Sequence, residues 1–335
     1  MGGPVRWGIV GFGWVAQDYM APAIREAGDR LVAVADPDPA SRGVAQAAGM
    51  RAHAEAAALF ADPEIEAVYV ATPNHLHVDA VLAAMTAGKA VLCEKPMAAT
   101  LDEAERMGAF CRNSPVLYGT AFDQRHHPAH RALAAVIRDG AIGRPSAVRI
   151  VYACWVGTGW SAGAARENWR IDAAKAGGGA LIDLAPHGLD LVEFLLGEPL
   201  EGVAAYTQTR IQDYAVDDGA VIVGATGSGV LASLHVAYNC PEALPRRRLE
   251  IVGADGMLVA EDTMGQVAGG TVRRIDGASG EHTPLVVPDS GVSPFTAQVR
   301  AFSAALRSGD RGAFSVERDL HTMRLVHQAY ASAAR

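Results

Sequence analysis

The chain has 335 residues, half of them hydrophobic and a fifth charged, which is the composition of a folded protein rather than a disordered or fibrous one. This length exceeds what one hydrophobic core usually organises, so we expect two domains with a cleft between them. The formal net charge of −8, with only one short arginine run at 246–248, argues against nucleic acid as a partner.

Three further features bear on location and metal content. The four cysteines are far apart and form no Cys-x-x-Cys motif, so neither a disulfide framework nor a zinc knuckle is predicted. The first residues lead directly into a strand pattern, which leaves no room for a signal peptide. The apolar stretch 221–238 is interrupted by 226–229 (TGSG) and predicts two strands joined by a turn, not a membrane span. We therefore expect a cytoplasmic protein with no membrane segment.

The first third of the sequence alternates short apolar runs with longer, mostly Ala-rich stretches. The predicted strands are 5–10, 31–35, 67–71, 90–93 and 116–118, and the predicted helices are 17–27, 40–48, 78–87 and 101–112. Strands that are apolar along their whole length are typical of a parallel sheet with helices on both faces. The alternation predicts an α/β domain over residues 1–122, a doubly wound parallel sheet of the Rossmann type that binds a dinucleotide.

The rhythm changes after residue 120, where strand-like runs follow one another along the chain. The predicted strands are 146–152, 203–210, 220–225, 230–238, 249–252 and 272–275, and the predicted helices are 130–138, 181–196, 295–308 and 316–333. Successive strands of this kind indicate a mostly antiparallel sheet. We expect residues 123–335 to form an α+β domain for substrate binding and oligomerisation, with the helices over one face of the sheet.

A glycine-rich segment follows the first predicted strand and precedes the first predicted helix. It consists of Gly11, Phe12, Gly13, Trp14, Val15 and Ala16. The first glycine permits a tight turn, the second lets the backbone approach a pyrophosphate, and the small Ala16 allows close helix–strand packing. The anion then lies at the helix N-terminus. We predict dinucleotide binding here; the alternative is a glycine-rich turn in a Rossmann-like domain that binds none.

Asp36 lies at the end of the second predicted strand, 20 residues after Ala16. A carboxylate here would accept hydrogen bonds from ribose hydroxyls and repel a 2′-phosphate, which favours NAD over NADP. The alternative role is to cap the stretch that follows. Ser41 and Arg42 lie close enough in sequence to contribute to this end of the cofactor site, and they leave NADP open as a second option.

Glu94, Lys95 and Pro96 stand where the predicted strand 90–93 ends, at the carboxyl edge of the sheet. Open α/β sheets bind their ligands at this edge. The Lys95 ammonium could donate a hydrogen bond to a substrate oxygen and stabilise charge that develops there during hydride transfer. The alternative is a solvated surface lysine, and the sequence leaves the two readings even.

Three glycines, 177–179, precede a stretch in which Asp183 and His187 are four residues apart, on one face if the stretch is helical. His187 can take a hydroxyl proton, while Asp183 orients it or binds a neighbouring hydroxyl. The alternative is a buried pair that braces the helix. Pro186 lacks an N–H, so it should fall in the first turn or mark a kink.

Trp169 and Arg170, just before the glycines, could stack and bond in a cleft or simply pack. The histidines are less informative, because no set of four zinc ligands at recognisable spacings can be assembled from them. We therefore predict no metal.

With these residues placed, the chain resembles the Gfo/Idh/MocA family of NAD(P)-dependent oxidoreductases over nearly its whole length. The residues that carry the resemblance are the glycine loop at 11–16, Ala71-Thr72-Pro73-Asn74 with His77, Glu94-Lys95-Pro96, segment 140–145, and Gly177–Gly179 leading to Asp183 and His187. The resemblance implies a Rossmann domain followed by an α+β domain with an open sheet. The exposed face of that sheet commonly builds homodimers or homotetramers.

The resemblance also implies residue roles. By position, Lys95 is similar to the family's catalytic lysine, His187 to its acid–base residue and Asp183 to the partner that often completes the triad. The positions similar to those that line the nicotinamide half of the cofactor are Thr72, Pro73, Asn74, His77 and Glu94, and we add Lys95 and Pro96. Arg144-Pro145 and Trp169-Arg170 resemble the anhydrofructose-reductase branch, where the Trp-Arg pair lies beside the cofactor. That branch carries a neutral residue at position 36 and favours NADPH, so Asp36 departs from it.

These residues together predict an enzyme that transfers a hydride between NAD and a hydroxyl carbon of a sugar, a sugar derivative or inositol. One alternative is redox-neutral chemistry, as in a sugar lyase or glycosidase with tightly bound NAD. The other is a non-catalytic module that senses a sugar or NAD. The presence of Lys95, Asp183 and His187 argues against a sensor, which needs no acid–base residues. The identity of the sugar does not follow from the sequence.

Overall fold

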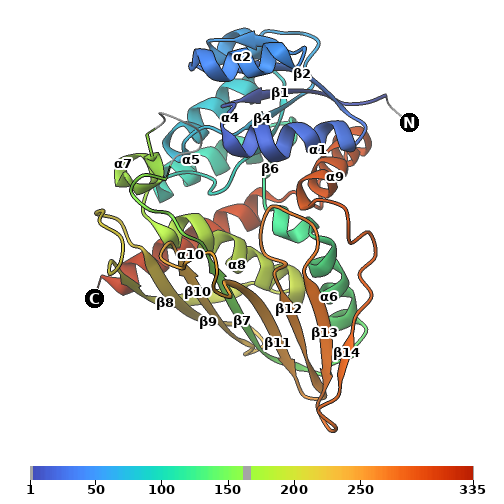
Figure 1. Cartoon of the computed structure of the whole chain (residues 1–335). Helices are drawn as coiled ribbons and strands as arrows, with labels where there is room; N and C mark the ends of the chain where they lie inside the picture. Colours follow the sequence, from blue (N-terminus) through green and yellow to red (C-terminus); the bar gives the residue numbers. More distant parts are fainter. Residues whose placement is uncertain (1–2, 161–166, 335) are drawn as a thin grey trace.

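The structure is a computed structural model that describes residues 3–160 and 167–334. It contains two sheets stacked along the long axis of the molecule (Figure 1). One sheet has six strands and the other has eight. The α/β architecture predicted from the sequence is confirmed: a parallel sheet is followed by a separate, mostly antiparallel one.

The N-terminal sheet is parallel, in the order β3-β2-β1-β4-β5-β6. Its strands are β1 (Arg6–Val10), β2 (Arg30–Ala35), β3 (Arg51–His53), β4 (Ala67–Val70), β5 (Ala90–Cys93) and β6 (Tyr118–Thr120). The connecting helices are α1 (Ala21–Glu26), α2 (Pro39–Ala47), α3 (Ala56–Phe60), α4 (His77–Thr86) and α5 (Leu101–Arg112). The strand order reverses between β1 and β4, which is where a doubly wound sheet opens a crevice at the carboxyl ends of its strands.

The C-terminal sheet has the order β14-β13-β12-β11-β7-β10-β9-β8. Its strands are β7 (Pro145–Ala153), β8 (Leu200–Gln208), β9 (Gly219–Thr226), β10 (Leu231–Ala237), β11 (Arg247–Gly253), β12 (Gly256–Glu261), β13 (Thr271–Asp276) and β14 (His282–Pro284). The apolar stretch 221–238 is the predicted pair of strands, since β9 and β10 pair antiparallel. Within this sheet, only β7 and β10 are parallel neighbours among the described strands.

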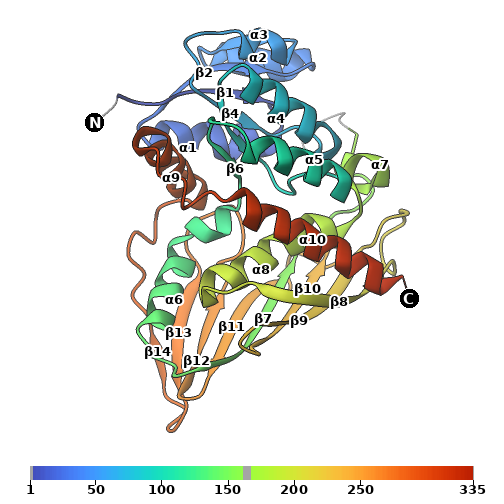
Figure 2. The ribbon, with the colours of Figure 1, turned by 180° about the vertical axis from the view of Figure 1, so that it is seen from behind.

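Helices cover one face of this second sheet. Figure 2 shows α6 (Pro128–Arg138), α8 (Ala180–Leu196) and α10 (Val316–Ala333) lying over it. Leu181, Leu191 and Val192 of α8 belong to the same buried cluster as Ile150 and Leu234 of the sheet. Pro186 lies inside α8, well past its first turn, so its missing N–H does not mark the start of the helix.

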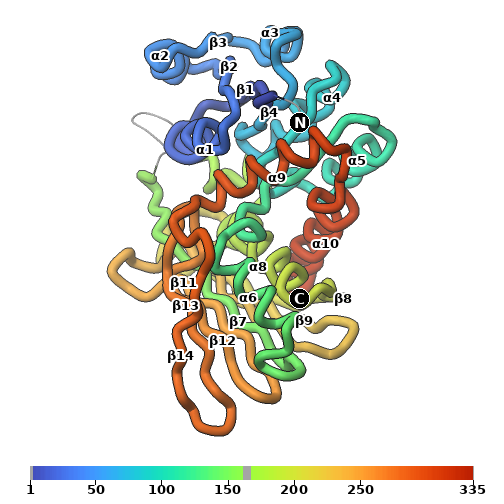
Figure 3. The backbone as a smooth tube through the Cα atoms, turned by 90° about the vertical axis from the view of Figure 1, so that its right-hand side faces the viewer, coloured from blue at the N-terminus to red at the C-terminus, as the bar shows by residue number. Residues whose placement is uncertain are grey.

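Helix α9 (Pro294–Ser308) does not cover the second sheet, so that part of the sequence prediction is wrong. It lies against α1 of the N-terminal half (Figure 3). The reason is its apolar face, on which Phe302 contacts the ring of Trp7 in β1 at 5.3 Å between centroids. The chain therefore returns to the Rossmann half after completing the second sheet. No helix within residues 3–160 and 167–334 is both long and apolar enough to cross a membrane.

Candidate active site

Two adjoining cavities lie at the carboxyl edge of the N-terminal sheet. The first, of about 420 Å³, is lined by Lys95, Asp183 and His187 together with residues of the second sheet. The second, of about 500 Å³, is lined by the glycine loop, Asp36 and the segment after β4. Both are lined by Thr72 and Arg170, so the two cavities form one continuous site. The residues come from distant segments that the fold brings together.

The glycine loop packs so closely against the segment after β4 that only glycine fits at its first position. Gly11 has a φ of +84°, and a Cβ there would lie 2.6 Å from the Ala71 carbonyl oxygen. Its amide donates to the Ala35 carbonyl at 2.9 Å. Of the other loop residues, Gly13, Trp14 and Val15 line the second cavity, whereas Phe12 is buried in the core and does not.

Asp36 lines the second cavity and also holds the glycine loop in place. Its carboxylate accepts from the amides of Phe12 at 2.7 Å and Asp38 at 2.8 Å. Ser41 and Arg42 do not line either cavity: Ser41 is buried at the start of α2, and the Arg42 guanidinium donates to the carbonyls of Asp36 and Pro37. Arg42 therefore supports the backbone that carries Asp36, whereas Ser41 donates to the Asp38 carboxylate.

The segment after β4 forms the wall between the cavities. The Asn74 amide donates to the Ala176 carbonyl at 2.8 Å, which ties this wall to the second half of the chain. The two ring nitrogens of His77 face the carbonyls of Thr72 and Pro96, each at 2.9 Å. Burial lowers the pKa of His77 to about 4, so the ring is neutral at pH 7 and donates to one carbonyl only. Pro96 itself lines neither cavity.

Thr72 contributes a polar atom that the protein leaves unused. Its hydroxyl Oγ1 is buried and has no hydrogen-bond partner among the described residues. A buried hydroxyl without a partner carries an unfavourable free energy of desolvation. Because Thr72 lines both cavities, this hydroxyl fits a polar ligand that passes from one to the other.

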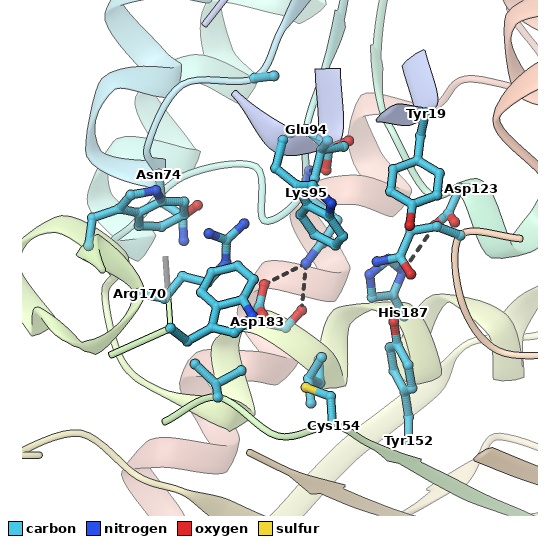
Figure 4. A pocket seen from close by; sticks show the side chains of 18 of the residues that line it. Tyr19, Asn74, Glu94, Lys95, Asp123, Tyr152, Cys154, Arg170, Asp183 and His187 are labelled. Atoms are coloured by element: carbon cyan, nitrogen blue, oxygen red, sulfur yellow. Dashed lines mark hydrogen bonds and ion pairs between the residues drawn. The ribbon is translucent and has the colours of Figure 1, made fainter. Parts of the chain in front are cut away.

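Lys95 and Asp183 form a partly buried ion pair in the first cavity (Figure 4). The Lys95 Nζ atom lies 2.6 Å from Asp183 Oδ1 and also donates to the Asp183 carbonyl at 2.9 Å. The Tyr238 hydroxyl donates to Asp183 Oδ2 at 2.6 Å. Burial alone would raise the pKa of Asp183, but the charge of Lys95, aided by Arg170 and these hydrogen bonds, lowers it well below its usual value. Asp183 therefore stays ionised and anchors the ammonium.

Glu94, the neighbour of Lys95, also lines the first cavity. Burial raises the pKa of its carboxyl group, and the Tyr69 hydroxyl donates a hydrogen bond to it. Glu94 is thus fixed from the sheet side and holds the chain that presents Lys95.

The carboxylate beside His187 is Asp123, not Asp183. Asp123 Oδ1 lies 3.3 Å from His187 Nδ1, and both side chains are almost fully buried. Burial would raise the pKa of Asp123, but the nearby His187, the charge of Lys95 and a hydrogen bond from the Gln124 amide bring it below its ordinary value. Tyr152 packs edge-on against the imidazole, with ring centroids 5.6 Å apart. Figure 4 shows Lys95 and His187 entering the same pocket from opposite sides.

Asp123 and Tyr238 are site residues that the sequence analysis did not single out. Asp123 follows β6 in a short 3-10 turn (η3, Asp123–His126), and Tyr238 follows β10. The signal that could have found Asp123 is a lone acidic residue after an apolar run at the carboxyl edge of the sheet, the same position that pointed to Lys95.

Trp169 and Arg170 line both cavities. The Arg170 guanidinium carbon lies 4.5 Å from the centroid of the Trp169 ring and 4.9 Å from that of Trp160. Trp160 in turn meets Trp14 of the glycine loop edge-on. Arg170 is therefore held between two aromatic rings while its charge lines both cavities.

Comparison with known proteins gives two family matches. Residues 5–122 match the GFO_IDH_MocA family, described as an oxidoreductase family with an NAD-binding Rossmann fold, and residues 130–259 match the GFO/IDH/MocA C-terminal domain. A 1,5-anhydro-D-fructose reductase from Ensifer adhaerens is 32% identical over 98% of this chain and 98% of its own length. The chain belongs to the Gfo/Idh/MocA family. It is an oxidoreductase with an NAD-binding Rossmann fold, and the resemblance noted in the sequence is confirmed.

This Gfo/Idh/MocA oxidoreductase has more distant relatives as well. A D-xylose 1-dehydrogenase (NADP(+)) from Haloferax volcanii is 28% identical over 98% of this chain and 97% of its own. The crystal structure of an aldose-aldose oxidoreductase from Caulobacter crescentus, complexed with glycerol, has a TM-score of 0.86 and is 26% identical, covering 99% of this chain and 98% of that one. Both sheets of the oxidoreductase are thus shared with a solved relative.

The oxidoreductase shows no cluster of metal ligands in the part of the chain that the structure describes: no three His, Cys, Asp or Glu side chains gather in a suitable arrangement.

Proposed function

We propose that this oxidoreductase catalyses reversible hydride transfer between NAD and a hydroxyl-bearing carbon of a sugar, a sugar derivative or inositol. The observation that carries the proposal is the convergence of Lys95 and His187 on one cavity that continues into the glycine-loop cavity. The names of the relatives, an anhydrofructose reductase and a xylose dehydrogenase, support a sugar as the substrate.

The residues present fit a dinucleotide. Gly11 gives the backbone approach that a pyrophosphate needs, and Thr72 offers a buried hydroxyl without a partner among the described residues. Gly13, Trp14 and Val15 would hold the pyrophosphate end, Asp36 the ribose hydroxyls, and Thr72, Pro73 and Asn74 the nicotinamide half. Arg170 would lie beside the cofactor. We assign NAD because of the Asp36 carboxylate, with NADP as the second option.

In this proposal His187 accepts the proton of the substrate hydroxyl, and Lys95 stabilises the negative charge on its oxygen. His187 Nδ1 faces Asp123, so Nε2 is the nitrogen left to take the proton of the substrate hydroxyl. The ionised Asp123 stabilises the imidazolium that results. The Lys95 ammonium donates to the same oxygen and stabilises its negative charge until the carbonyl forms. Bound NAD would accept the hydride that leaves the carbon. The substrate thus loses a hydride to NAD and a proton to His187.

A screen of the purified protein tests this function. A ligand stabilises the state that it binds, so each cofactor that binds should raise the thermal unfolding midpoint. The rise should be larger with NAD(H) than with NADP(H). NADH absorbance is then followed with a panel of sugars and inositols. Accumulation of NADH with at least one sugar is the expected result. No stabilisation by either cofactor, or no net NADH with any of them, would contradict the proposal.

We further propose that the protein is a homodimer or homotetramer through the open face of the second sheet. Val221, Val223 and Leu231 are exposed there on β9 and β10, next to Tyr206 of β8. Exposed apolar side chains that gather on one face mark an interaction surface.

Light scattering checks this assembly. The wild-type protein should have two or four times the 35.0 kDa mass of the chain, and Val223→Glu should yield the monomer because it places a charge in the apolar face. Val286→Glu is the matched control, since Val286 is even more exposed but follows β14 at the sheet edge. A monomeric wild type would overturn the assembly.

A further inference from the structure

The arginine run 246–248 is the one charged motif of the sequence that the proposed function does not use. Arg247 begins β11 and pairs in register with Tyr152 of β7. Directly opposed residues of neighbouring strands project to the same face of a sheet. Tyr152 contacts His187, so Arg247 also projects from the sheet toward His187, and it lines the first cavity.

The three arginines differ in their partners. Arg246 pairs with Glu242 at 3.6 Å, and Arg248 pairs with Glu250 at 2.7 Å and Glu261 at 2.5 Å. Arg247 forms no ion pair with any described residue, and its Nε atom is buried without a hydrogen-bond partner there. Buried donors of a charged group rarely remain unused, because each costs the full free energy of its desolvation.

The surrounding chain makes room for the Arg247 guanidinium. Any side chain at Gly265, in the loop after β12, would overlap the Nη1 atom of Arg247. Arg247 lines the first cavity together with Tyr19 of the N-terminal half. The guanidinium therefore faces the space between the two halves of the chain.

The acidic side chains of the cavity already have partners. Asp183 is bound by Lys95 and Tyr238, and Glu94 accepts from Tyr69. Asp123 accepts from the Gln124 amide and lies beside His187, and Glu242 pairs with Arg246. The cofactor cannot supply the missing anion, because Arg247 does not line the glycine-loop cavity that a pyrophosphate would occupy. The remaining candidate is the second ligand of the first cavity, which is the substrate.

We propose that the substrate is an anionic sugar, one that carries a carboxylate or a phosphate, and that Arg247 binds this group. The inference rests on the proposed function, since it names the substrate class of the same site. Arginine suits the role because its planar guanidinium binds oxyanions through two parallel hydrogen bonds. Arg247 is a binding residue that reaches the cavity from strand β11 of the second sheet.

Calorimetric binding to the NADH-loaded protein tests the inference independently of turnover. The probes are matched sets: glucose, glucuronate, gluconate and glucose 6-phosphate, with the corresponding galactose compounds. At least one acid should bind at least about 10-fold more tightly than its neutral parent, as expected for a charge-assisted hydrogen bond. The carboxylates and the phosphates form separate arms, and the tighter arm identifies the anionic group.

Two variants of the same strand provide the control. Arg247→Ala should weaken binding of the preferred acid about 10- to 100-fold and leave the neutral sugar unchanged. Arg248→Ala removes an arginine whose partners, Glu250 and Glu261, lie outside the cavity, and it should leave the preference for acids intact. Equal binding of acids and neutral sugars, binding of no acid, or an unaltered preference in Arg247→Ala would overturn the inference. Binding of acids without NADH formation would support it and contradict the proposed hydride transfer instead.

Discussion

Replacing Lys95 by methionine is expected to lower kcat about 10²- to 10³-fold, the loss seen when one preorganised donor to a developing oxyanion is removed. Methionine keeps the length and the apolar stem of the side chain but has no ammonium. The Nζ atom is held 2.6 Å from Asp183 Oδ1, so it does not have to reorganise when charge develops on the substrate. Steady-state kinetics with saturating NAD measure the change.

The same variant leaves a buried carboxylate without its counter-charge, so the unfolding midpoint should fall as well. The double variant Lys95→Met with Asp183→Asn removes both charges and should recover most of the midpoint but none of the rate. Lys175→Met is the matched control, because Lys175 lies in the short helix α7 (Ala173–Ala176) and its own side chain lines neither cavity. A rate that recovers together with stability would show that Lys95 is structural only.

His187→Asn is expected to lower kcat about 10²- to 10⁴-fold, because the general base for the hydroxyl proton is lost. NADH binding should persist, since His187 does not line the second cavity, which the glycine loop shares with Asp36. Added imidazole should restore part of the rate by taking the same proton, a result that a purely structural histidine would not give. Pre-steady-state NADH formation separates this step from product release.

Two further variants sharpen the test of His187. Asp123→Asn keeps the shape of the partner but removes its charge, and it should lower kcat by less than His187→Asn does. His282→Asn alters an exposed histidine on the edge strand β14 and should leave kcat unchanged. An unchanged kcat in His187→Asn would exclude this residue as the base.

Local sequence patterns predicted most of the fold and part of the site. The glycine loop, the buried strands β4 and β5 and the carboxyl-edge position of Lys95 follow from residue order alone, because each depends on neighbours within one βαβ unit. The spacing of Asp183 and His187 also placed them on one helix. It did not reveal their partners, since Lys95 and Asp123 meet that helix only through tertiary packing.

Long-range packing explains what the sequence could not show. The sequence shows that α9 has an apolar face but not which half of the molecule that face packs against. In the structure Phe302 of α9 packs against Trp7 of the N-terminal half. Similarly, three consecutive arginines are indistinguishable in sequence. Because side chains alternate along a strand, Arg248 faces the side of the sheet where Glu250 and Glu261 pair with it. Arg247 projects to the other side and forms no ion pair with a described residue.

The transfer of deuterium from substrate to cofactor tests the central claim most directly. The protein is incubated with NAD and sugars, neutral and acidic, that are deuterated at every carbon, and the NADH formed is analysed by mass spectrometry. If Lys95 and His187 act on a hydroxyl carbon beside the nicotinamide, the NADH carries one deuterium. Unlabelled NADH, or none with any of the sugars, would contradict hydride transfer from the substrate carbon.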